Sequence, residues 1–420
     1  MAVITLQQEA AALGDFYVPR FRIKIGGKNL PVFVVNDVLQ LSYTDHIKEL
    51  DSFEFTVNNW DEVAQEFKYV GAETLASMDD QNQDPKNKDS KKKDPKKSFN
   101  PLHRLFEPGR TVELSMGYGD TLKLMLTGTF TTLEPTFPSS GGSTLAVRGL
   151  NLLHRLRTKQ RSQTFQGKKE SKIAESFKTL ADPDNKGKKL PVLIGDNALK
   201  VETDIPYVAQ KNQYDIDFLY ERARRAGYVL YIKEAEKKGD KTIKERGIYF
   251  GRSEDGNPVI RQDVLELKWG ISLIDFKPTM TTANQVSSVT VNAWNVATKS
   301  PIVGKASIEN QKLNQDIHKL LDKSDAREES VVDEPMFTQK QADLRAEAIL
   351  LERTKDLVCA TGTCVGLPDL RAGCRVRINS LGARFSGEYF VTDTTHSIND
   401  SGYITKFTAR REELGKGADQ

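Results

Sequence analysis

Apolar and polar residues alternate along several stretches in the first third of the chain. The pattern covers residues 21–25, 53–57, 112–118 and 122–126. A period of two places one face of a strand in a core and the other face in solvent or against a partner. Turn-forming sequences separate the stretches, at Gly26-Gly27, Gly117–Asp120 and Ser139–Gly142. Short strands at this spacing predict an antiparallel barrel or sandwich over residues 21–158.

One segment interrupts this β region. Residues 79–98 contain seven Lys, five Asp and no apolar residue. Such a segment has no apolar surface to bury, so we expect a charged, flexible insertion. A Lys-rich run is also able to bind a phosphate-rich partner, but the interleaved Asp residues favour a solvated insertion.

The character of the chain changes over residues 159–264, where helical periods appear. Residues 171–181 and 215–226 each place their apolar side chains on one helical face, and Gly227 stands where a C-cap glycine belongs. Strand-like pieces follow at residues 228–232 and 247–250. This mixture predicts a small α+β domain.

A second β region is expected from residue 265 to residue 412. Its alternating residues begin with Val289 and Val291, before Trp294, and return at the stretches 375–378, 389–392 and 402–409. Residues 300–356 interrupt it as an inserted helical and polar segment. In that segment Thr338 and Gln341 have the spacing of a capping box, and one helical stripe follows at Ala342, Ala346, Ile349, Leu350 and Arg353.

The whole chain is therefore predicted to be mainly β with α+β parts. Two similar β-barrel domains, a small α+β domain and a helical insertion lie between an N-terminal segment, residues 1–20, and a tail, residues 413–420. We expect the two β regions to be duplicated barrels.

Composition narrows the partners. The 61 Lys and Arg residues nearly cancel the 58 Asp and Glu residues, for a net charge of +3, so the charge balance gives no argument for nucleic acid. No apolar run approaches the roughly 18 residues of a membrane span. The N-terminus lacks the basic start and apolar core of a signal peptide, so we expect synthesis and folding in the cytoplasm.

The three cysteines, Cys359, Cys364 and Cys374, lie in one short stretch. A structural zinc site needs four ligands, usually with a tight Cys pair, and no His follows these cysteines at a ligand spacing. The default interpretation is small buried thiols in a β core, with no metal. Their odd number argues against a disulfide framework.

No constellation for catalysis is visible in the sequence. The five histidines are scattered, and none pairs with Cys, Ser or another His at a motif spacing: His46, His103, His154, His318 and His396. Zinc-protease, nucleophile-elbow and phosphate-loop motifs are all missing from the sequence. Gly117–Gly119 fits a hairpin turn better than a phosphate loop. A carboxylate pair for cell-wall hydrolysis is not excluded, but nothing points to one.

Several segments, taken together and in order, resemble the VgrG and phage late control protein D family, the hub of contractile tails. The stretch from Gln213 to Leu219, followed by Ala226-Gly227-Tyr228, resembles the family's most distinctive helix. The other segments that carry the resemblance are residues 50–57, 108–130, 145–156, 269–294 and 370–403. The resemblance covers residues 20–410.

This resemblance implies architecture and no catalysis. Family members form homotrimers, in which two similar barrels per chain give a ring with quasi-sixfold symmetry between a hexameric tail tube and a trimeric spike. The family continues into an OB-fold and a β-helical spike, whereas this sequence ends soon after Arg410-Arg411. The resemblance therefore implies a separate spike protein as partner, besides the tube protein and other baseplate proteins.

The resulting prediction is a structural baseplate hub that is not an enzyme, with no catalytic, cofactor or metal residues and no contact with nucleic acid or membrane. We expect it in an assembled contractile particle, which lysis is able to release. The alternatives are a tail-associated cell-wall hydrolase and a receptor- or carbohydrate-binding baseplate module. Four arginines, at positions 371, 375, 377 and 384, are expected either to face acidic neighbours or a wet lumen in a ring, or to be solvated.

Overall fold

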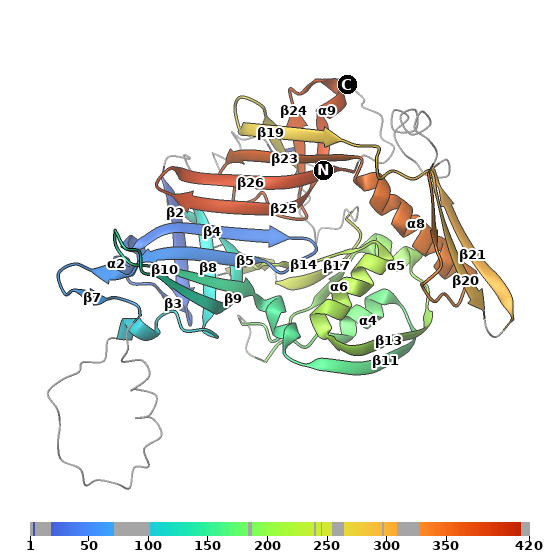
Figure 1. The fold of residues 1–420 in the computed structure, drawn as a ribbon, viewed down its shortest axis with the longest axis horizontal. Helices are drawn as coiled ribbons and strands as arrows, with labels where there is room; N and C mark the ends of the chain where they lie inside the picture. Colours follow the sequence, from blue (N-terminus) through green and yellow to red (C-terminus); the bar gives the residue numbers. More distant parts are fainter. Residues whose placement is uncertain are drawn as a thin grey trace, which may run out of the picture.

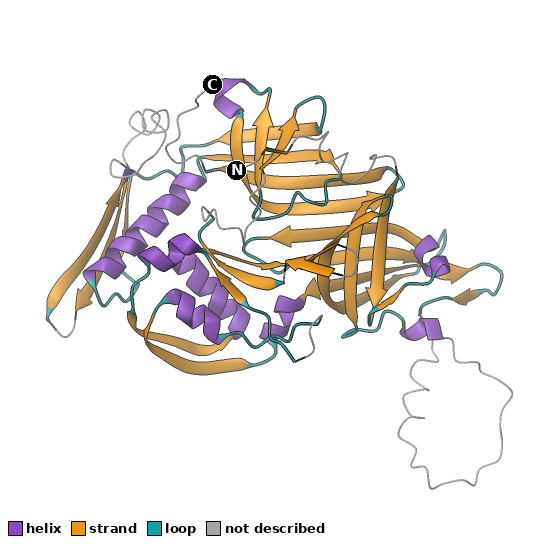
Figure 2. Ribbon diagram, turned by 180° about the vertical axis from the view of Figure 1, so that it is seen from behind, coloured by secondary structure: helices purple, strands orange, loops and turns teal. Residues whose placement is uncertain are grey.

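Strands make up most of the computed structural model, and the longer helices gather at one side of the molecule (Figures 1 and 2). The structure describes residues 3–4, 18–70, 101–183, 187–238, 241–244, 246–253, 264–295, 298–308 and 327–412. The expected mainly β fold is confirmed. The predictions for residues 79–98 and for the tail 413–420 lie outside the described residues, as does most of the segment 1–20.

The first group of strands belongs to one large sheet. Its strands pair in the order β4-β5-β10-β9-β8-β2-β3. Their bounds are β2 Pro19–Ile25, β3 Lys28–Asn29, β4 Val38–His46, β5 Ser52–Asn58, β8 Thr111–Tyr118, β9 Thr121–Thr136 and β10 Thr144–Asn151. The strand pairs in this group are antiparallel.

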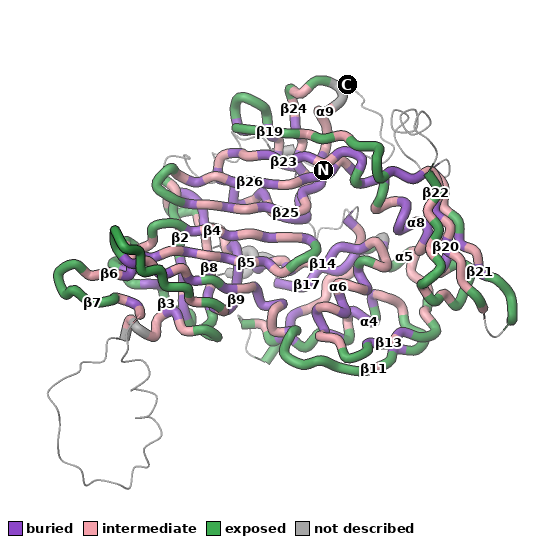
Figure 3. The backbone as a smooth tube through the Cα atoms, viewed as in Figure 1, coloured by how far each residue is buried: buried purple, intermediate pink, exposed green. Residues whose placement is uncertain are grey.

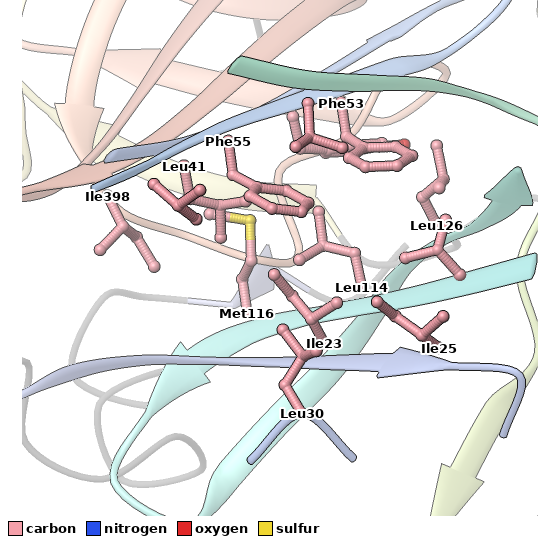
Figure 4. Packing of buried hydrophobic residues seen from close by; sticks show 14 of the residues in the cluster. Ile23, Ile25, Leu30, Leu41, Phe53, Phe55, Leu114, Met116, Leu126 and Ile398 are labelled. Atoms are coloured by element: carbon pink, nitrogen blue, oxygen red, sulfur yellow. The ribbon is translucent and has the colours of Figure 1, made fainter. Parts of the chain in front are cut away.

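The alternation seen in the sequence decides which side chains fill the core of this group. Phe53 and Phe55 of β5 point inward and meet Phe130 of β9 edge to face, with ring centroids 5.8 and 6.1 Å apart. Ile23 and Ile25 of β2 close the same cluster from the opposite wall (Figure 4). The predicted hairpin at Gly117–Asp120 is present between β8 and β9, with Gly119 in the left-handed region at φ 51°.

The second group of strands continues the same sheet. Its order is β19-β23-β26-β25-β24-β18-β1. The bounds are β1 Val3–Ile4, β18 Val264–Lys268, β19 Leu273–Met280, β23 Val358–Val365, β24 Arg375–Asn379, β25 Gly387–Asn399 and β26 Gly402–Arg411. A separate cluster that includes Val376, Ile378 and Tyr389 forms its core.

The two groups meet where β4 pairs with β25. Asp393 lies opposite His46 and Ile398 opposite Leu41, so 14 strands form one sheet. The expectation of two closed barrels is therefore corrected, because no ladder among the described strands closes either group on itself. The physical reason is that β4 uses both of its edges, one on β5 and the other on β25.

The α+β region has its own core, formed by α6 and the sheet β12-β17-β14. Gly227, at φ 69°, ends α6 as predicted. The helix expected over residues 171–181 already ends at Ser176, and the apolar side chains of Phe177 and Leu180 beyond it are buried outside the helix. The elements are η3 Leu152–Arg157, β11 Gln160–Lys168, α4 Glu170–Ser176, β12 Val192–Ile194, α5 Asp196–Val201, β13 Ile205–Tyr214, α6 Asp215–Ala226, β14 Val229–Lys233, β15 Glu236–Lys238, β16 Lys241–Lys244 and β17 Gly247–Gly251.

A small layered unit lies beside this region. Its three strands are β20 Ser288–Asn295, β21 Ser300–Ser307 and β22 Glu328–Val331, and its helix is α8 Gln339–Lys355. Val289 and Val291 do alternate, but their strand pairs with β21 and β22 against α8 and does not enter the large sheet. The Thr338 hydroxyl accepts from the Gln341 amide as predicted, while the Gln341 side chain accepts from the Phe337 amide.

The remaining described elements are short. They are α2 Val32–Asn36, the hairpin β6 Trp60–Asp61 with β7 Glu66–Phe67, η2 Pro101–Arg104 and α9 Gly382–Phe385. No helix in the described part of the chain is long and apolar enough to cross a membrane.

Candidate functional site

A buried site with several charged and polar side chains lies at the junction of the two strand groups. Arg371, in the segment before β24, donates from Nε to Asp45 Oδ2 on β4 at 2.5 Å. The same guanidinium donates to the Tyr43 hydroxyl and to the Met125 carbonyl, the latter at 2.9 Å. Asp45 also accepts from the Thr394 hydroxyl of β25. The junction is thus held by a buried ion pair whose partners are 326 positions apart in the sequence.

The charges in this junction depend on one another. Burial alone raises the pKa of Asp45, but the Arg371 guanidinium and the Thr394 hydroxyl outweigh burial and hold it below its ordinary value. Asp51, in contrast, has neutral hydrogen-bond partners in the described part of the chain. It accepts from Asn151 Nδ2 at 2.9 Å and from the His46 amide at 3.2 Å, and burial, reinforced by the charge of Asp45, raises its pKa to about 8.

His396 completes the junction from β25 and is fully buried. Nδ1 lies 2.9 Å from the Tyr403 hydroxyl and 3.1 Å from the Thr405 hydroxyl. Nε2 lies 3.0 Å from the Leu370 carbonyl and 3.2 Å from the Thr394 hydroxyl. Because both ring nitrogens are occupied inside the protein, His396 has no side open to a substrate and serves as a structural link.

Two further buried ion clusters lie at other junctions. Arg246 donates to Glu234 Oε2 at 2.7 Å and to the Thr127 hydroxyl at 2.6 Å, which ties the α+β region to β9. Glu412 lies 2.8 Å from Arg410, 3.6 Å from Arg375 and 3.7 Å from Lys355. This second cluster joins the end of α8 to β24 and to the residues that follow β26.

The structure places the arginines singled out from the sequence. Arg371 pairs with Asp45, Arg375 with Glu412 and Arg377 with Glu388 at 2.6 Å, so these three have acidic partners within the chain. The side chain of Arg384 lies outside the described set. The alternative that these arginines are solvated is therefore wrong for Arg371, whose side chain is 13% exposed and faces Asp45.

The other candidate residues are not brought together. Cys364 and Cys374 are buried and Cys359 is half-buried, and none of the three is in a disulfide. Among the residues that the structure describes, no group of three His, Cys, Asp or Glu side chains converges as metal ligands would. His46 Nδ1 accepts from the Lys48 amide, and His154 is half-buried in η3. The side chain of His103 and all of His318 lie outside the described part.

A groove of about 390 Å³ runs between α6, β13 and residues 334–345. Burial raises the pKa of Glu202 in its wall, although the carboxylate accepts from the Ser171 amide at 3.1 Å and from the Tyr228 hydroxyl at 3.2 Å. Glu170, which also lines the groove, is held by two hydrogen bonds from Arg222. Two further carboxylates line the groove: Glu221, which accepts from the Gln213 side-chain amide, and Glu334, which pairs with Arg345. Each of the four carboxylates is therefore already engaged.

The sequence contained one signal for the junction. Leu41, Tyr43 and Asp45 occupy successive inward positions of β4, so a carboxylate stands in the apolar phase of an alternating strand. A charge in that phase must find a buried partner. Nothing local in the sequence identifies Arg371 as that partner.

A family model and several solved structures match this chain. A family model described as Alg8 N-terminal domain matches residues 93–400. Its description names neither VgrG nor late control protein D, so the resemblance seen in the sequence has its support from solved structures instead. No curated protein matches the sequence.

The solved structures share the fold over nearly the whole chain. The prophage MuSo2 43 kDa tail protein of Shewanella oneidensis has a TM-score of 0.61 at 12% identity, covering 94% of this chain and 98% of that protein. A tail protein of Neisseria meningitidis MC58 has a TM-score of 0.59 at 14% identity, covering 95% and 98%. The E. coli c3393 protein, a component of the type VI secretion system, has a TM-score of 0.53 at 12% identity, covering 95% and 79%. At these identities the likeness establishes the fold alone.

Proposed function

Because the chain belongs to the Alg8 N-terminal domain family and has the fold of phage-tail proteins, we propose that it is the structural baseplate hub of a contractile phage-tail-like injection system. In this role it is a homotrimer with quasi-sixfold symmetry that adapts a hexameric tail tube to a trimeric spike. The domain limits expected from the sequence, residues 21–158, 159–264 and 265–412, belong to the same proposal. It is made in the cytoplasm and becomes part of an assembled particle.

The observation that carries the proposal is the continuous sheet. Two strand groups, each with its own core, are joined edge to edge through β4 and β25, so their strands run along one another (Figure 1). Two related units per chain convert three copies into six positions that a hexameric ring is able to meet. The ion pair between Asp45 and Arg371 holds this spacing at the junction.

The test is stoichiometric. The chain is mixed with the spike protein and the tube protein of the same particle, and native mass spectrometry and light scattering measure the complexes. We expect a complex of three hub chains with one trimeric spike, and binding of the tube protein to it. A stable monomer that binds neither protein would refute the hub.

The groove between α6, β13 and residues 334–345 is the place where a cell-wall hydrolase, the first alternative function, is tested. Two of its carboxylates, Glu170 and Glu202, would be the pair of a cell-wall hydrolase, and the raised pKa of Glu202 suits a general acid. Against this, Arg222 neutralises Glu170, and Glu202 is bound by Ser171 and Tyr228. Release of soluble peptidoglycan fragments by the chain, abolished by Glu202→Gln, would establish the hydrolase; we expect no release from either protein.

A receptor- or carbohydrate-binding module is the remaining alternative. A glycan-binding face would show as retention of the chain on cell-wall polysaccharide or on whole target cells. We expect no such retention in the absence of the rest of the particle.

A further inference from the structure

Two groups of exposed apolar side chains lie at the same end of the strands of the large sheet. The first place, the hairpin patch, is formed by Val63, Phe67 and Phe137, which are 98%, 37% and 57% exposed. The second place, the turn patch, is formed by Trp269, Ile271 and Ile274, which are 58%, 67% and 59% exposed. Side chains of this size are seldom left in water together without a partner surface.

Ring contacts and turn hydrogen bonds hold the hairpin patch in one conformation. Phe67 packs against Trp60 and Phe137 with ring centroids 5.3 and 5.2 Å apart. Asp61 accepts from the Val63 amide at 2.9 Å and from the Ala64 amide at 3.0 Å, which fixes the turn that presents Val63. A preformed turn loses little conformational entropy when it binds, so it is suited to docking.

The two patches lie at the same end of the strands and at opposite sides of one run of the sheet. That run is β10-β5-β4-β25-β26-β23-β19. The residue pairs at this end of the run show the alignment. Asn58 of β5 lies opposite Thr144 of β10, and Leu41 of β4 lies opposite Ile398 of β25. At the far side of the run, Leu273 of β19 lies opposite Cys364 of β23. The hairpin follows β5 and Phe137 follows β9 at this end, while the turn patch precedes and begins β19 at the same end. In Figure 3 the hairpin β6–β7 projects at the left and β19 lies near the top, both largely exposed.

The charges around the patches are complementary. Asp61, Glu62 and Glu66 give the hairpin patch three negative charges, since the nearby Lys68 is paired with Asp37 at 2.7 Å. The turn patch carries exposed Lys268 and Lys277, with Asp275 as its one acidic neighbour in the segment 268–277. An acidic apolar surface and a basic apolar surface on the same chain favour contact between copies over contact within a copy, because they lie on opposite sides of the run.

We propose that the hairpin patch of one copy docks on the turn patch of a second copy, head to tail. Such a heterologous contact generates a ring when its rotation closes. The proposal deepens the homotrimer of the proposed hub and rests on it, since it names the surfaces through which the copies meet.

Cysteine cross-linking tests the contact. Val63→Cys and Ile271→Cys are made as separate variants, mixed together with the spike protein, and joined with a short bismaleimide. We expect a covalent dimer from the mixture and none from either variant alone, and a covalent trimer from the chain that carries both changes. Val332→Cys, at a site 72% exposed that belongs to neither patch, is the matched control, and the unchanged chain reports on the native cysteines.

Charge reversal tests the complementarity. Lys268→Glu with Lys277→Glu should weaken self-association about tenfold or more, and Glu62→Lys with Glu66→Lys added in the same chain should restore it. Circular dichroism confirms that each variant is folded.

The outcomes separate this inference from the hub itself. A trimer on the spike without the cross-link between positions 63 and 271, or a cross-link from Val63→Cys alone, overturns the docking while the hub stands. If the hairpin changes Glu62→Lys and Glu66→Lys abolish binding of the tube protein but leave self-association unchanged, the hairpin patch binds the tube, and the docking between copies is overturned. A chain that stays monomeric with spike and tube and forms no cross-link defeats both proposals.

Discussion

Replacing Arg371 by Leu should strongly destabilise the junction of the two strand groups. Arg371 neutralises Asp45, which is 4% exposed, and satisfies the Tyr43 hydroxyl and the Met125 carbonyl. Its loss leaves a buried carboxylate without a cation, which costs about 3–5 kcal/mol. Since whole domains are stable by about 5–15 kcal/mol, the effect is a large share of the total.

A double-mutant cycle separates the pair from its surroundings. When Asp45→Leu accompanies Arg371→Leu, the ion pair is removed as a whole, and the remaining cost is that of the two polar groups without a donor, about 1–3 kcal/mol each at most. We therefore expect the double variant to be more stable than Arg371→Leu alone, with a coupling of about 2 kcal/mol or more.

Urea unfolding followed by circular dichroism measures the loss, and hydrogen exchange at the amides of β4 and β25 locates it. The matched control is Arg377→Leu, because Arg377 is 40% exposed and pairs with Glu388 at the surface of the same group. Surface pairs of this kind contribute about 0–1 kcal/mol. If Arg371→Leu costs no more than Arg377→Leu, or if the two changes in the cycle are additive, the junction is not held by this ion pair.

Three further changes test other parts of the molecule. Burial raises the pKa of Asp51 to about 8, far above that of an unfolded Asp, so the folded state holds a proton that the unfolded state has lost. The free energy of unfolding should therefore fall by at most about 1.4 kcal/mol per pH unit up to pH 8 and level off above it. Asp51→Asn should flatten this slope in urea titrations at pH 6 to 9, and an unchanged slope would exclude Asp51 as its source. Gly304→Ala should loosen α8, since an added Cβ would stand 2.2 Å from the Ala342 carbonyl carbon; Gly142→Ala, with Asn58 Oδ1 at 3.8 Å as its nearest neighbour, is the control for the thermal melts. Deleting residues 79–98 should leave a soluble, folded chain, because the segment has no apolar residue to contribute to a core; insoluble protein would contradict this.

Local periodicity predicts the elements whose partners are close in the sequence. The alternation in residues 112–118 and 122–126 corresponds to β8 and β9, joined through Gly119. The apolar face of residues 215–226 corresponds to α6, and Gly227 ends it. In each case the signal and its cause lie within about ten residues of each other.

Long-range pairing leaves no such signal. The contact between β4 and β25 joins residues about 350 positions apart, and alternation alone does not state which strand a neighbour will be. For the same reason the alternation of Val289 and Val291 predicts their strand correctly but places it in the wrong sheet. The expectation of two closed barrels fails at the contact between β4 and β25, since closing each group would require these strands to pair elsewhere.

The positions of the three buried ion clusters bear on what the fold is built to do. Each cluster joins parts that have separate cores. Asp45 with Arg371 joins the two strand groups, and Glu234 with Arg246 joins the α+β region to β9 through Thr127. Glu412 joins the end of α8 to β24. Buried ion pairs add little net stability, because desolvation offsets their attraction, but they penalise every arrangement that separates the partners. Apolar contacts alone would tolerate small shifts between these parts. A chain that presents two patches at a fixed spacing to its neighbours needs those shifts excluded, so the clusters stand where the geometry of a ring would be set.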